Sequence, residues 1–315
     1  MNAPATLQIS LAPTDLPHAK VLLPHQLRAW SGQVNEVVLS VDGHKGPAGG
    51  RFTEGWEERR PGLDALLAKC CRQSTHVRVA EVDYGQEARR QVAERFFDGA
   101  PLPEKDSRGG PFYSYFHGLH EAANDLVLHI DSDLLFGGGS QRWIEEASAL
   151  IAQRQDALAC NPLGGPPTAD RSRWHDPVEP HTSLAFRCSS ISTRLFLVDR
   201  RRLAPLPLRP PARARSRAKA RLHGNPAFAL PEELLTSAMH ERGMVRIDLL
   251  GEDPGMWSLH APYRSATFYA GLDDLVRRVE TGDVPDEQRG DFDVNDSLVD
   301  WSDARAAFRR RRWIS

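Results

Sequence analysis

The sequence is poor in cysteine, and it has neither a long apolar run nor an excess of charge of one sign. Its four cysteines are Cys70, Cys71, Cys160 and Cys188. No two of them form a C-x-x-C pair, which argues against a zinc ribbon or a thioredoxin-like redox site. Because two of the four are adjacent, they suit a reducing compartment better than a disulfide framework. No apolar run approaches the roughly 18 residues that a membrane-spanning helix needs.

The charges and the first residues narrow the class of protein further. Residues 1–20 lack a basic stretch followed by an apolar core, so no signal peptide is expected. The chain has 40 basic and 42 acidic residues, a net charge of −2, so no general attraction to nucleic acid or membranes follows. We therefore expect a cytoplasmic protein with no nucleic-acid partner and no integral membrane segment. Its 315 residues allow one large α/β domain or two small ones.

In the first half of the chain, short apolar segments alternate with helical segments. The predicted strands are 7–11, 36–41, 77–82 and 126–130, and the predicted helices are 18–30, 63–71, 87–97 and 113–123. This alternation is typical of a doubly wound parallel sheet. We therefore expect an α/β fold with a mostly parallel sheet flanked by helices.

The second half of the chain has a less regular pattern. Ser140 can cap a helix whose apolar positions between 143 and 151 fall on one face. The other predicted strands are 157–160, 192–198, 245–250 and 257–260, the helices are 234–242, 272–280 and 301–312, and 161–191 is a loop.

A basic run lies in the middle of this second half. Nine basic residues and no acid lie between Arg200 and Arg221. The first interpretation is a solvated flexible loop, because a run of like charges does not pack well. The alternative is a mobile flap that meets a diphosphate or an anionic acceptor. Nucleic acid is disfavoured, since no aromatic residues stand between the basic ones as stacking platforms.

The strand 126–130 ends in two carboxylates and is followed by three glycines. Ligands of open α/β sheets bind beyond the carboxyl ends of such strands, so Asp131 and Asp133 stand where chemistry is expected. Two oxygen ligands so close suit a hard divalent cation, which adds water and phosphate oxygens. The alternative is a turn in which both carboxylates bond nearby backbone N–H groups. Gly137 to Gly139 are expected to bend the chain away beside them.

The segment HGLHEAANDLVLHIDSDLLF, residues 117–136, resembles the helix, strand and Asp-x-Asp motif of GT-A-fold glycosyltransferases, especially those of family 2. The resemblance implies a Rossmann-like fold in which Asp131 and Asp133 hold Mn²⁺ or Mg²⁺ against the diphosphate of a nucleotide sugar. It also implies a single domain over 1–315. Its parts would be a nucleotide-binding half (1–140), an acceptor-side half (141–270) and a helical C-terminal tail (271–315).

The resemblance extends to a late histidine and to an earlier aspartate. His260, in the sequence WSLH, resembles the residue that completes metal coordination in many of these enzymes. Two carboxylates and an imidazole leave room for phosphate oxygens and water around an octahedral ion, although a lone histidine is usually structural. Asp42 ends the strand 36–41, where the family has an acceptor for the nucleotide base, such as the uracil imide. An Asp-Gly turn explains Asp42 equally well.

Three more donor-side residues follow from the resemblance alone. Ala12 lies at the exit of the first strand, where the family often has Pro-x-x-Asn; the sequence here is Ala-Pro-Thr-Asp, which departs from that pattern. Arg89, in YGQEARRQ, stands where the family has a Gly-plus-Arg helix start and could reach the donor. Ser132, between the two aspartates, could support the ribose or the phosphates through its hydroxyl or backbone.

An acidic pair, Glu232 and Glu233, precedes the predicted helix 234–242. Family 2 enzymes carry Glu-Asp at such a helix start, and the second acid acts as general base; Glu-Glu is a departure from that pattern. Carboxylates are also stabilised at helix N-termini by the macrodipole, which is a purely structural explanation. Glu252 and Asp253 form a more typical pair but precede Pro-Gly rather than a helix, so Glu233 is the preferred base.

The sequence thus predicts a metal-dependent glycosyltransferase that moves a sugar from a nucleotide-diphosphate donor, with UDP-sugars favoured, to an unknown hydroxyl acceptor. With Glu233 as base, the transfer inverts the anomeric configuration. One alternative is a phosphatase of the haloacid dehalogenase type, which also has Asp-x-Asp after a strand. That group normally has Thr or Val where this chain has Leu135. Another alternative is a non-catalytic nucleotide-sugar-binding protein on the same fold.

Overall fold

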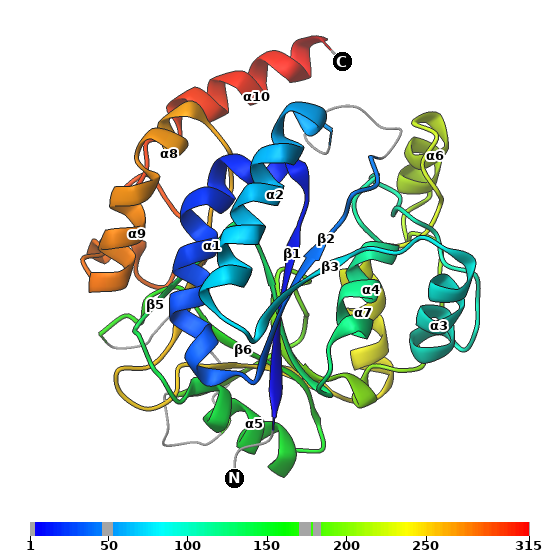
Figure 1. Cartoon of the computed structure of the whole chain (residues 1–315), viewed down its shortest axis with the longest axis horizontal. Helices are drawn as coiled ribbons and strands as arrows, with labels where there is room; N and C mark the ends of the chain where they lie inside the picture. Colours follow the sequence, from blue (N-terminus) through cyan, green and yellow to red (C-terminus); the bar gives the residue numbers. More distant parts are fainter. Residues whose placement is uncertain (1–3, 46–52, 170–177, 179–183, 315) are drawn as a thin grey trace.

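A ten-stranded sheet forms the centre of the computed structural model, which describes residues 4–45, 53–169, 178 and 184–314 (Figure 1). Its strands are β1 (Ala5–Leu11), β2 (Glu36–Val41), β3 (Val77–Glu81), β4 (Leu126–Asp131), β5 (Leu134–Gly137), β6 (Ala157–Gly164), β7 (Ala185–Cys188), β8 (Leu195–Asp199), β9 (Val245–Leu249) and β10 (Trp257–His260). The order is β3-β2-β1-β4-β8-β6-β10-β5, and β9 pairs with β6 and β7 beside this path.

Helices cover the sheet on both sides (Figure 1). They are α1 (Leu16–Trp30), α2 (Trp56–Gln73), α3 (Gln86–Phe97), α4 (Tyr113–Glu121), α5 (Trp143–Gln153), α6 (Ala214–Leu222), α7 (Pro231–Glu241), α8 (Ala266–Ala270), α9 (Leu272–Thr281) and α10 (Ser302–Ile314). Short 3-10 turns join several of them. The alternation of strand and helix expected for the first half of the chain is therefore confirmed.

The first four strands run parallel, and the order in which the chain adds them reverses direction at the centre of the sheet, between β1 and β4. β2 and β3 lie on one side of β1, whereas β4 lies on the other. The connections above β1 and β4 therefore lead in opposite directions, and ligands of such sheets bind at this switch point. Ser10 and Asp131 are register partners, so the exits of β1 and β4 lie side by side.

The two faces of the sheet pack against different helices. Leu128 and Ile130 of β4 lie in one buried cluster with residues of α1, α2 and α5. Val127, on the opposite face of the same strand, lies in a second cluster with residues of α3, α4 and α7. This follows from the two-residue period of a strand, because a strand buried on both faces is apolar at every position. His129 and Asp131 share the face of Val127 and are the polar exceptions.

The C-terminal half of the sheet is mixed rather than parallel. β8 is antiparallel to both β4 and β6, while β10 is parallel to β6 and antiparallel to β5. The pairing of β5 with β10 places His260 opposite Leu134, the residue after Asp133. Leu135 of β5, Leu259 of β10 and the apolar face of α9 form a third buried cluster beneath this pair. The late histidine is thereby carried to the Asp-x-Asp motif.

The expected bend at the triple glycine is correct for two of the three residues. Gly138 and Gly139 have φ of 90° and 83°, so both adopt conformations that favour glycine. Gly137 instead ends β5 and lies against the buried ring of Trp257, where an added Cβ would lie 2.1 Å from the nearest ring atom. Here glycine is required by a close approach and not by a turn.

The prediction of a flexible loop for the basic run is wrong at both of its ends. Arg200 is buried and begins a 3-10 turn, and its Nη1 donates to the carbonyl oxygens of Leu119, His120 and Ala122 at the end of α4. The later part of the run forms α6, and only residues 203–213 are irregular. A guanidinium satisfies several carbonyls at a helix end at once, which the charge pattern alone does not show.

Two smaller predictions also need correction. The helix after the triple glycine begins at Trp143, and its N-cap residue is Arg142 rather than the predicted Ser140. Ser140 Oγ instead accepts a hydrogen bond from the backbone N–H of Arg142, before the helix begins. The expected loop at 161–191 contains the end of β6 and all of β7. Residues 170–177 and 179–183 of that loop lie outside the described part of the chain.

The structure bears on the cysteines and on the expected lack of a membrane-spanning helix. All four cysteines are free thiols, and two of them, Cys70 and Cys160, are buried. Among the helices that the structure describes, none combines the length and the apolar character needed to cross a bilayer.

We predict that Gly137→Ala lowers the free energy of unfolding by about 1–3 kcal/mol, because the new methyl group overlaps the Trp257 ring and overpacks the site. Urea unfolding followed by circular dichroism measures the change. Gly164→Ala is the matched control in β6, since an added Cβ there meets Phe292 at an ordinary 3.7 Å. Equal stabilities of the two variants would contradict the close approach of Trp257 to β5.

Candidate functional site

Asp131 and Asp133 lie at the switch point, at the carboxyl end of β4. Asp131 is the last residue of β4, and Ser132 and Asp133 form the turn into β5. The backbone N–H of Asp131 donates to the carbonyl oxygen of Arg194 at 2.8 Å, which ties the strand end to the segment before β8. The Asp133 side chain is 12% exposed, against 38% for Asp131. The Asp133 carboxylate is therefore more deeply buried than that of Asp131.

One face of α1 fixes this turn through three buried polar side chains. Gln26 Nε2 donates to the carbonyl oxygens of Asp131 and Leu134, both at 3.0 Å. His25 accepts the backbone N–H of Phe136 on Nε2 at 2.8 Å, and its Nδ1 donates to Glu280 at 2.7 Å. Burial lowers the pKa of His25, so the neutral ring that this pattern requires is favoured. These contacts hold the backbone that carries both aspartates.

The third polar residue on this face is His18, which contacts Ser132, the residue between the two aspartates. Its Nε2 lies 3.1 Å from Ser132 Oγ, and both residues are buried. Burial, reinforced by the nearby Arg264, lowers the pKa of His18 to about 4. The Ser132 hydroxyl is thus engaged with α1, so the predicted contribution of Ser132 to donor binding rests on its backbone.

His260 is oriented by a carboxylate on one side and faces Asp133 on the other. Its Nδ1 lies 2.7 Å from Asp293 Oδ1, and since a carboxylate only accepts, Nδ1 must carry the proton. In the neutral ring, Nε2 then carries the lone pair, and it lies 3.8 Å from Asp133 Oδ2. The ring also stacks on Phe292, with centroids 5.8 Å apart. A carboxylate–histidine pair of this kind fixes the tautomer that binds a metal ion.

Arg264 balances the charge of Asp133. Its Nη2 lies 3.1 Å from Asp133 Oδ2, and its Nη1 lies 3.2 Å from Asp15 Oδ1. Burial disfavours the charged carboxylate, but Arg264, His260 and His18 overcome this and lower the pKa of Asp133 to about 2. Asp133 is therefore an anion at neutral pH, as a metal ligand must be.

Asp131 has a different electrostatic environment. Burial raises its pKa, and neighbouring Asp133 adds to this rise, while His129 and Arg194 oppose it. His129 lies beneath it on the same face of β4, with Nε2 at 3.6 Å from Asp131 Oδ1, and its Nδ1 contacts Gln8 Oε1. A positive ion bound beside Asp131 would favour its charged form, because an opposite charge offsets the cost of desolvation.

The donor set fits a hard divalent cation, although no finished ligand shell is present. Asp133 Oδ1 is buried and has no hydrogen-bond partner, so this oxygen is free to bind a ligand. Adjacent ligands about 2.1 Å from an octahedral ion lie about 3 Å apart, so Asp133 Oδ2 and His260 Nε2, which lie 3.8 Å apart, would have to approach each other by slightly less than about 1 Å. Within the described ranges, no three His, Cys, Asp or Glu side chains already converge on a single point.

The predicted base-recognition residue, Asp42, lies at the exit of β2 and is largely occupied. It accepts hydrogen bonds from the Tyr84 hydroxyl at 3.0 Å, from Lys105 Nζ at 3.1 Å and from the His44 backbone N–H at 3.0 Å. A carboxylate has about four acceptor positions, so one position remains. Burial and the nearby Asp42 raise the pKa of Tyr84, which stays a donor.

The other two donor-side residues are also held by the protein. Ala12 lies at the exit of β1, and its backbone N–H donates to Asp15 Oδ2 at 2.9 Å. Arg89 lies on α3, where it binds Glu104 Oε1 and the carbonyl oxygen of Leu102, both at 2.7 Å. In this arrangement the Arg89 guanidinium stabilises the loop after α3, and a contact with the donor would require it to leave Glu104.

The acidic pair begins α7, as expected from the sequence. Glu233 Oε2 accepts the Leu230 backbone N–H at 3.2 Å, so it caps its own helix. Glu232 and Glu233 both line a cavity of about 400 Å³, whose wall also includes Arg194 and Phe292. Since Arg194 binds the Asp131 backbone and Phe292 stacks on His260, this cavity adjoins the candidate metal site.

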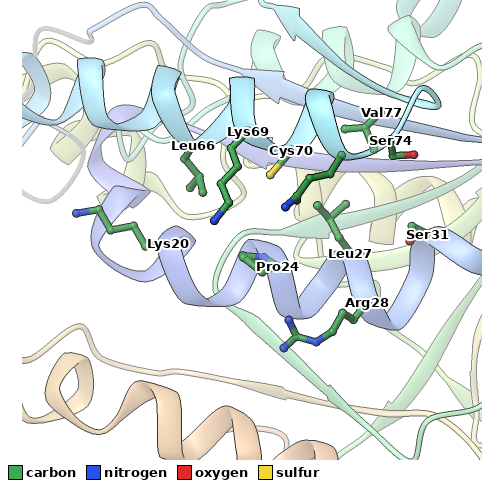
Figure 2. A pocket seen from close by; sticks show the side chains of 11 residues that line it. Lys20, Pro24, Leu27, Arg28, Ser31, Leu66, Lys69, Cys70, Ser74 and Val77 are labelled. Carbon is green, nitrogen blue, oxygen red and sulfur yellow. The ribbon is translucent and has the colours of Figure 1, made fainter.

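A second cavity, of about 380 Å³, lies between α1 and α2 (Figure 2). Lys69 of α2 points into it, Lys20 of α1 lies at its edge, and Ser74 and Val77 lie at the opposite end. It contains none of the predicted site residues. Because Val77 begins β3, this cavity reaches towards the amino ends of the strands, away from the Asp-x-Asp motif.

Several residues of the site have no signal in the sequence. Asp293, Arg264 and Gln26 reach the motif only through the tertiary fold, and nothing near them along the chain marks them as functional. His129 could have been found, because it precedes Asp131 by two residues and must share its face of the strand.

Comparisons with known proteins return structures but no sequence relatives. No protein-family model and no curated protein matches the chain. One similar structure is the mannosyltransferase PcManGT from Pyrobaculum calidifontis in complex with GDP-Man and Mn²⁺, at 12% identity and a TM-score of 0.45 over 90% of this chain and 66% of that one. The present chain thus spans slightly less than two thirds of that protein.

Two further structures resemble the chain at the same 12% identity. One is glucosyl-3-phosphoglycerate synthase from Mycobacterium tuberculosis with Mn²⁺, UDP and glucosyl-3-phosphoglycerate, with a TM-score of 0.37 over 88% of this chain and 78% of that one. The other is an active-site mutant of LgtC, with a TM-score of 0.34 over 77% of this chain and 72% of that one.

We predict that Gln26→Leu destabilises the protein by about 1–3 kcal/mol, because it removes the side-chain donor from the carbonyl oxygens of Asp131 and Leu134, and the bond to Leu134 is buried. Chemical denaturation measures the change. Gln141→Leu is the control, since its hydrogen bond to Gly139 is exposed, and it should change stability by less than about 0.5 kcal/mol. A Gln26 variant as stable as the Gln141 variant would show that α1 does not hold the turn.

Proposed function

We propose that the protein is a metal-dependent glycosyltransferase that moves a sugar from a nucleotide-diphosphate donor, preferably a UDP-sugar, to a hydroxyl acceptor. The observation that carries this proposal is the pair Asp133 and His260 at the switch point of the sheet. Nε2 of a fixed histidine tautomer lies 3.8 Å from one carboxylate oxygen, and the other oxygen is buried without a partner. Such a pair, placed where nucleotides bind to open α/β sheets, suits an ion that carries a diphosphate.

Asp131, Asp133 and His260 would hold the cation, Mn²⁺ or Mg²⁺. Bound there, the ion would act as a Lewis acid and neutralise charge on the departing diphosphate. Asp293 keeps the His260 lone pair directed at the ion, and Gln26 keeps the two aspartates in register. Arg264 competes for Asp133 Oδ2 at 3.1 Å, so it must leave that oxygen or be balanced by the phosphates when the ion binds.

The donor would lie over the exits of β1 and β2. Ala12, at the exit of β1, would lie against the donor on the side of the base, and Ser132 would contact the ribose or the phosphates through its backbone. Asp42 would accept a hydrogen bond from the base through its remaining acceptor position, and Arg89 would reach the donor after leaving Glu104.

Glu233 is the proposed general base. It would take the proton of the acceptor hydroxyl as that oxygen bonds to the anomeric carbon. The bond from this carbon to the diphosphate oxygen breaks at the same time, and its electron pair leaves with the diphosphate. Attack from the face opposite the leaving group inverts the anomeric configuration. Glu233 lines the cavity beside the metal site, which supports its assignment over Glu252 and Asp253; those two lie in the turn between β9 and β10, and neither lines this cavity.

We predict that Asp133→Ala abolishes Mn²⁺-dependent binding of UDP while the fold stays intact, because Asp133 is the more buried of the two aspartates proposed to bind the metal ion. Isothermal titration calorimetry with Mn²⁺ and UDP measures the binding, and circular dichroism monitors the fold. Asp286→Ala is the control, since the Asp286 side chain is 96% exposed and lies on a surface turn. Undiminished Mn²⁺-dependent binding in the Asp133 variant would rule out the metal assignment.

We also predict that Glu233→Gln leaves the affinity for the donor unchanged and slows transfer by about 100-fold or more, as expected for the loss of a general base. Release of UDP or GDP from UDP-glucose or GDP-mannose with Mn²⁺ measures turnover. Glu241→Gln, at the exposed C-terminal end of α7, is the matched control and should keep full activity. Wild-type turnover in the Glu233 variant would remove Glu233 from the mechanism, and hydrolysis of p-nitrophenyl phosphate alone would favour a phosphatase.

A further inference from the structure

The cavity beside the metal site has an uneven charge distribution. Two guanidiniums and two carboxylates line it: Arg194 and Arg246, and Glu232 and Glu233. Arg246 is paired with Asp248, whose two carboxylate oxygens it binds at 2.7 and 2.9 Å. Its charge is therefore neutralised within the protein.

Arg194 is the cation of this cavity that remains available. Its side chain is half-buried, and among the residues that the structure describes it makes no hydrogen bond or ion pair. Only its backbone is engaged, with the Asp131 N–H and with Ser192 Oγ. A guanidinium has five donors in a fork that matches a carboxylate or a phosphate, and binding one would satisfy them.

The position of Arg194 links this cavity to the reaction. The carbonyl oxygen of Arg194 accepts the backbone N–H of Asp131 at 2.8 Å, so Arg194 lies directly beside the end of β4. Phe292, which lines the same cavity, stacks on the ring of His260. At about 400 Å³, the cavity has the size of a site for a small molecule.

We propose that this cavity is the acceptor site, and that Arg194 binds the carboxylate or phosphate group of a small hydroxyl-bearing acceptor. This inference rests on the proposed glycosyl transfer. The charges would also orient the acceptor. Its anionic group is attracted to Arg194 and repelled by Glu232 and Glu233, so its hydroxyl end is directed to the acidic pair, where the base stands.

The test measures binding of three probes that share a three-carbon skeleton: D-glycerate, glycerol 3-phosphate and glycerol. Calorimetry is performed on the full chain with UDP and Mn²⁺ present. We expect one or both anions to bind and glycerol to show no binding. Glycerate alone would identify a carboxylate acceptor, and glycerol 3-phosphate alone would identify a phosphate.

Variants locate the contact. Arg194→Gln should weaken anion binding by about 10-fold to 100-fold, the loss expected for charged hydrogen bonds, while the affinity for UDP and Mn²⁺ stays unchanged. Arg194→Lys keeps the charge and should retain part of the affinity. Arg72→Gln, on the exposed side of α2, is the matched control and should bind as the wild type does.

The outcomes separate this inference from the proposed function. Equal binding of glycerol and the anions, unchanged anion binding in Arg194→Gln, or no anion binding tighter than about 10 mM would overturn it. If the anions bind through Arg194 but UDP and Mn²⁺ do not bind, the anion site stands and the glycosyltransferase proposal fails. If UDP and Mn²⁺ bind and the anions do not, the acceptor assignment alone fails.

Discussion

The charge of Asp133 is the constraint on which the rest of the site depends. A carboxylate this deeply buried is costly unless positive or polar partners surround it, and the fold supplies them from distant parts of the chain. Arg264 lies 3.1 Å from it, His260 faces it, and His18 approaches from α1. The same balance explains why a divalent cation would be attracted there, since Arg264 neutralises only one of its two oxygens.

The mixed C-terminal half of the sheet serves this arrangement. His260 ends β10, which runs in the same direction as β4, so both strands exit towards the motif. Here β5 returns directly after Asp133 and pairs with β10, so a histidine from late in the chain reaches the motif. Gly137 allows the two strands to approach, because any side chain there would meet Trp257. Backbone pairing therefore sets the distance between Asp133 and His260, and the side chains fix their orientation.

The sequence was sufficient for the parts of the site that local pattern determines. A short apolar run that ends in Asp131 and Asp133 is recognisable as a buried strand, and His260 ends a short strand of its own. Asp293 and Arg264 could not be predicted, because each acts through a contact with a residue far away in the chain. The buried polar face of α1 was hidden for the same reason: Gln26 and His25 resemble surface residues until their partners in β4 and β5 are known. The buried position of Arg200 could not be predicted from the charge pattern, because the carbonyl oxygens that it binds at the end of α4 come together only in the folded chain.

The central claim, that Asp133 and His260 bind one divalent ion together with a diphosphate, is tested most directly by pulsed electron paramagnetic resonance of Mn²⁺ in the presence of UDP. The account predicts that a single Mn²⁺ shows coupling both to an imidazole nitrogen and to phosphorus, and that His260→Ala loses the nitrogen coupling but retains the phosphorus coupling. A Mn²⁺–UDP complex with no nitrogen coupling in the wild-type protein, or one that His260→Ala leaves unchanged, would contradict it.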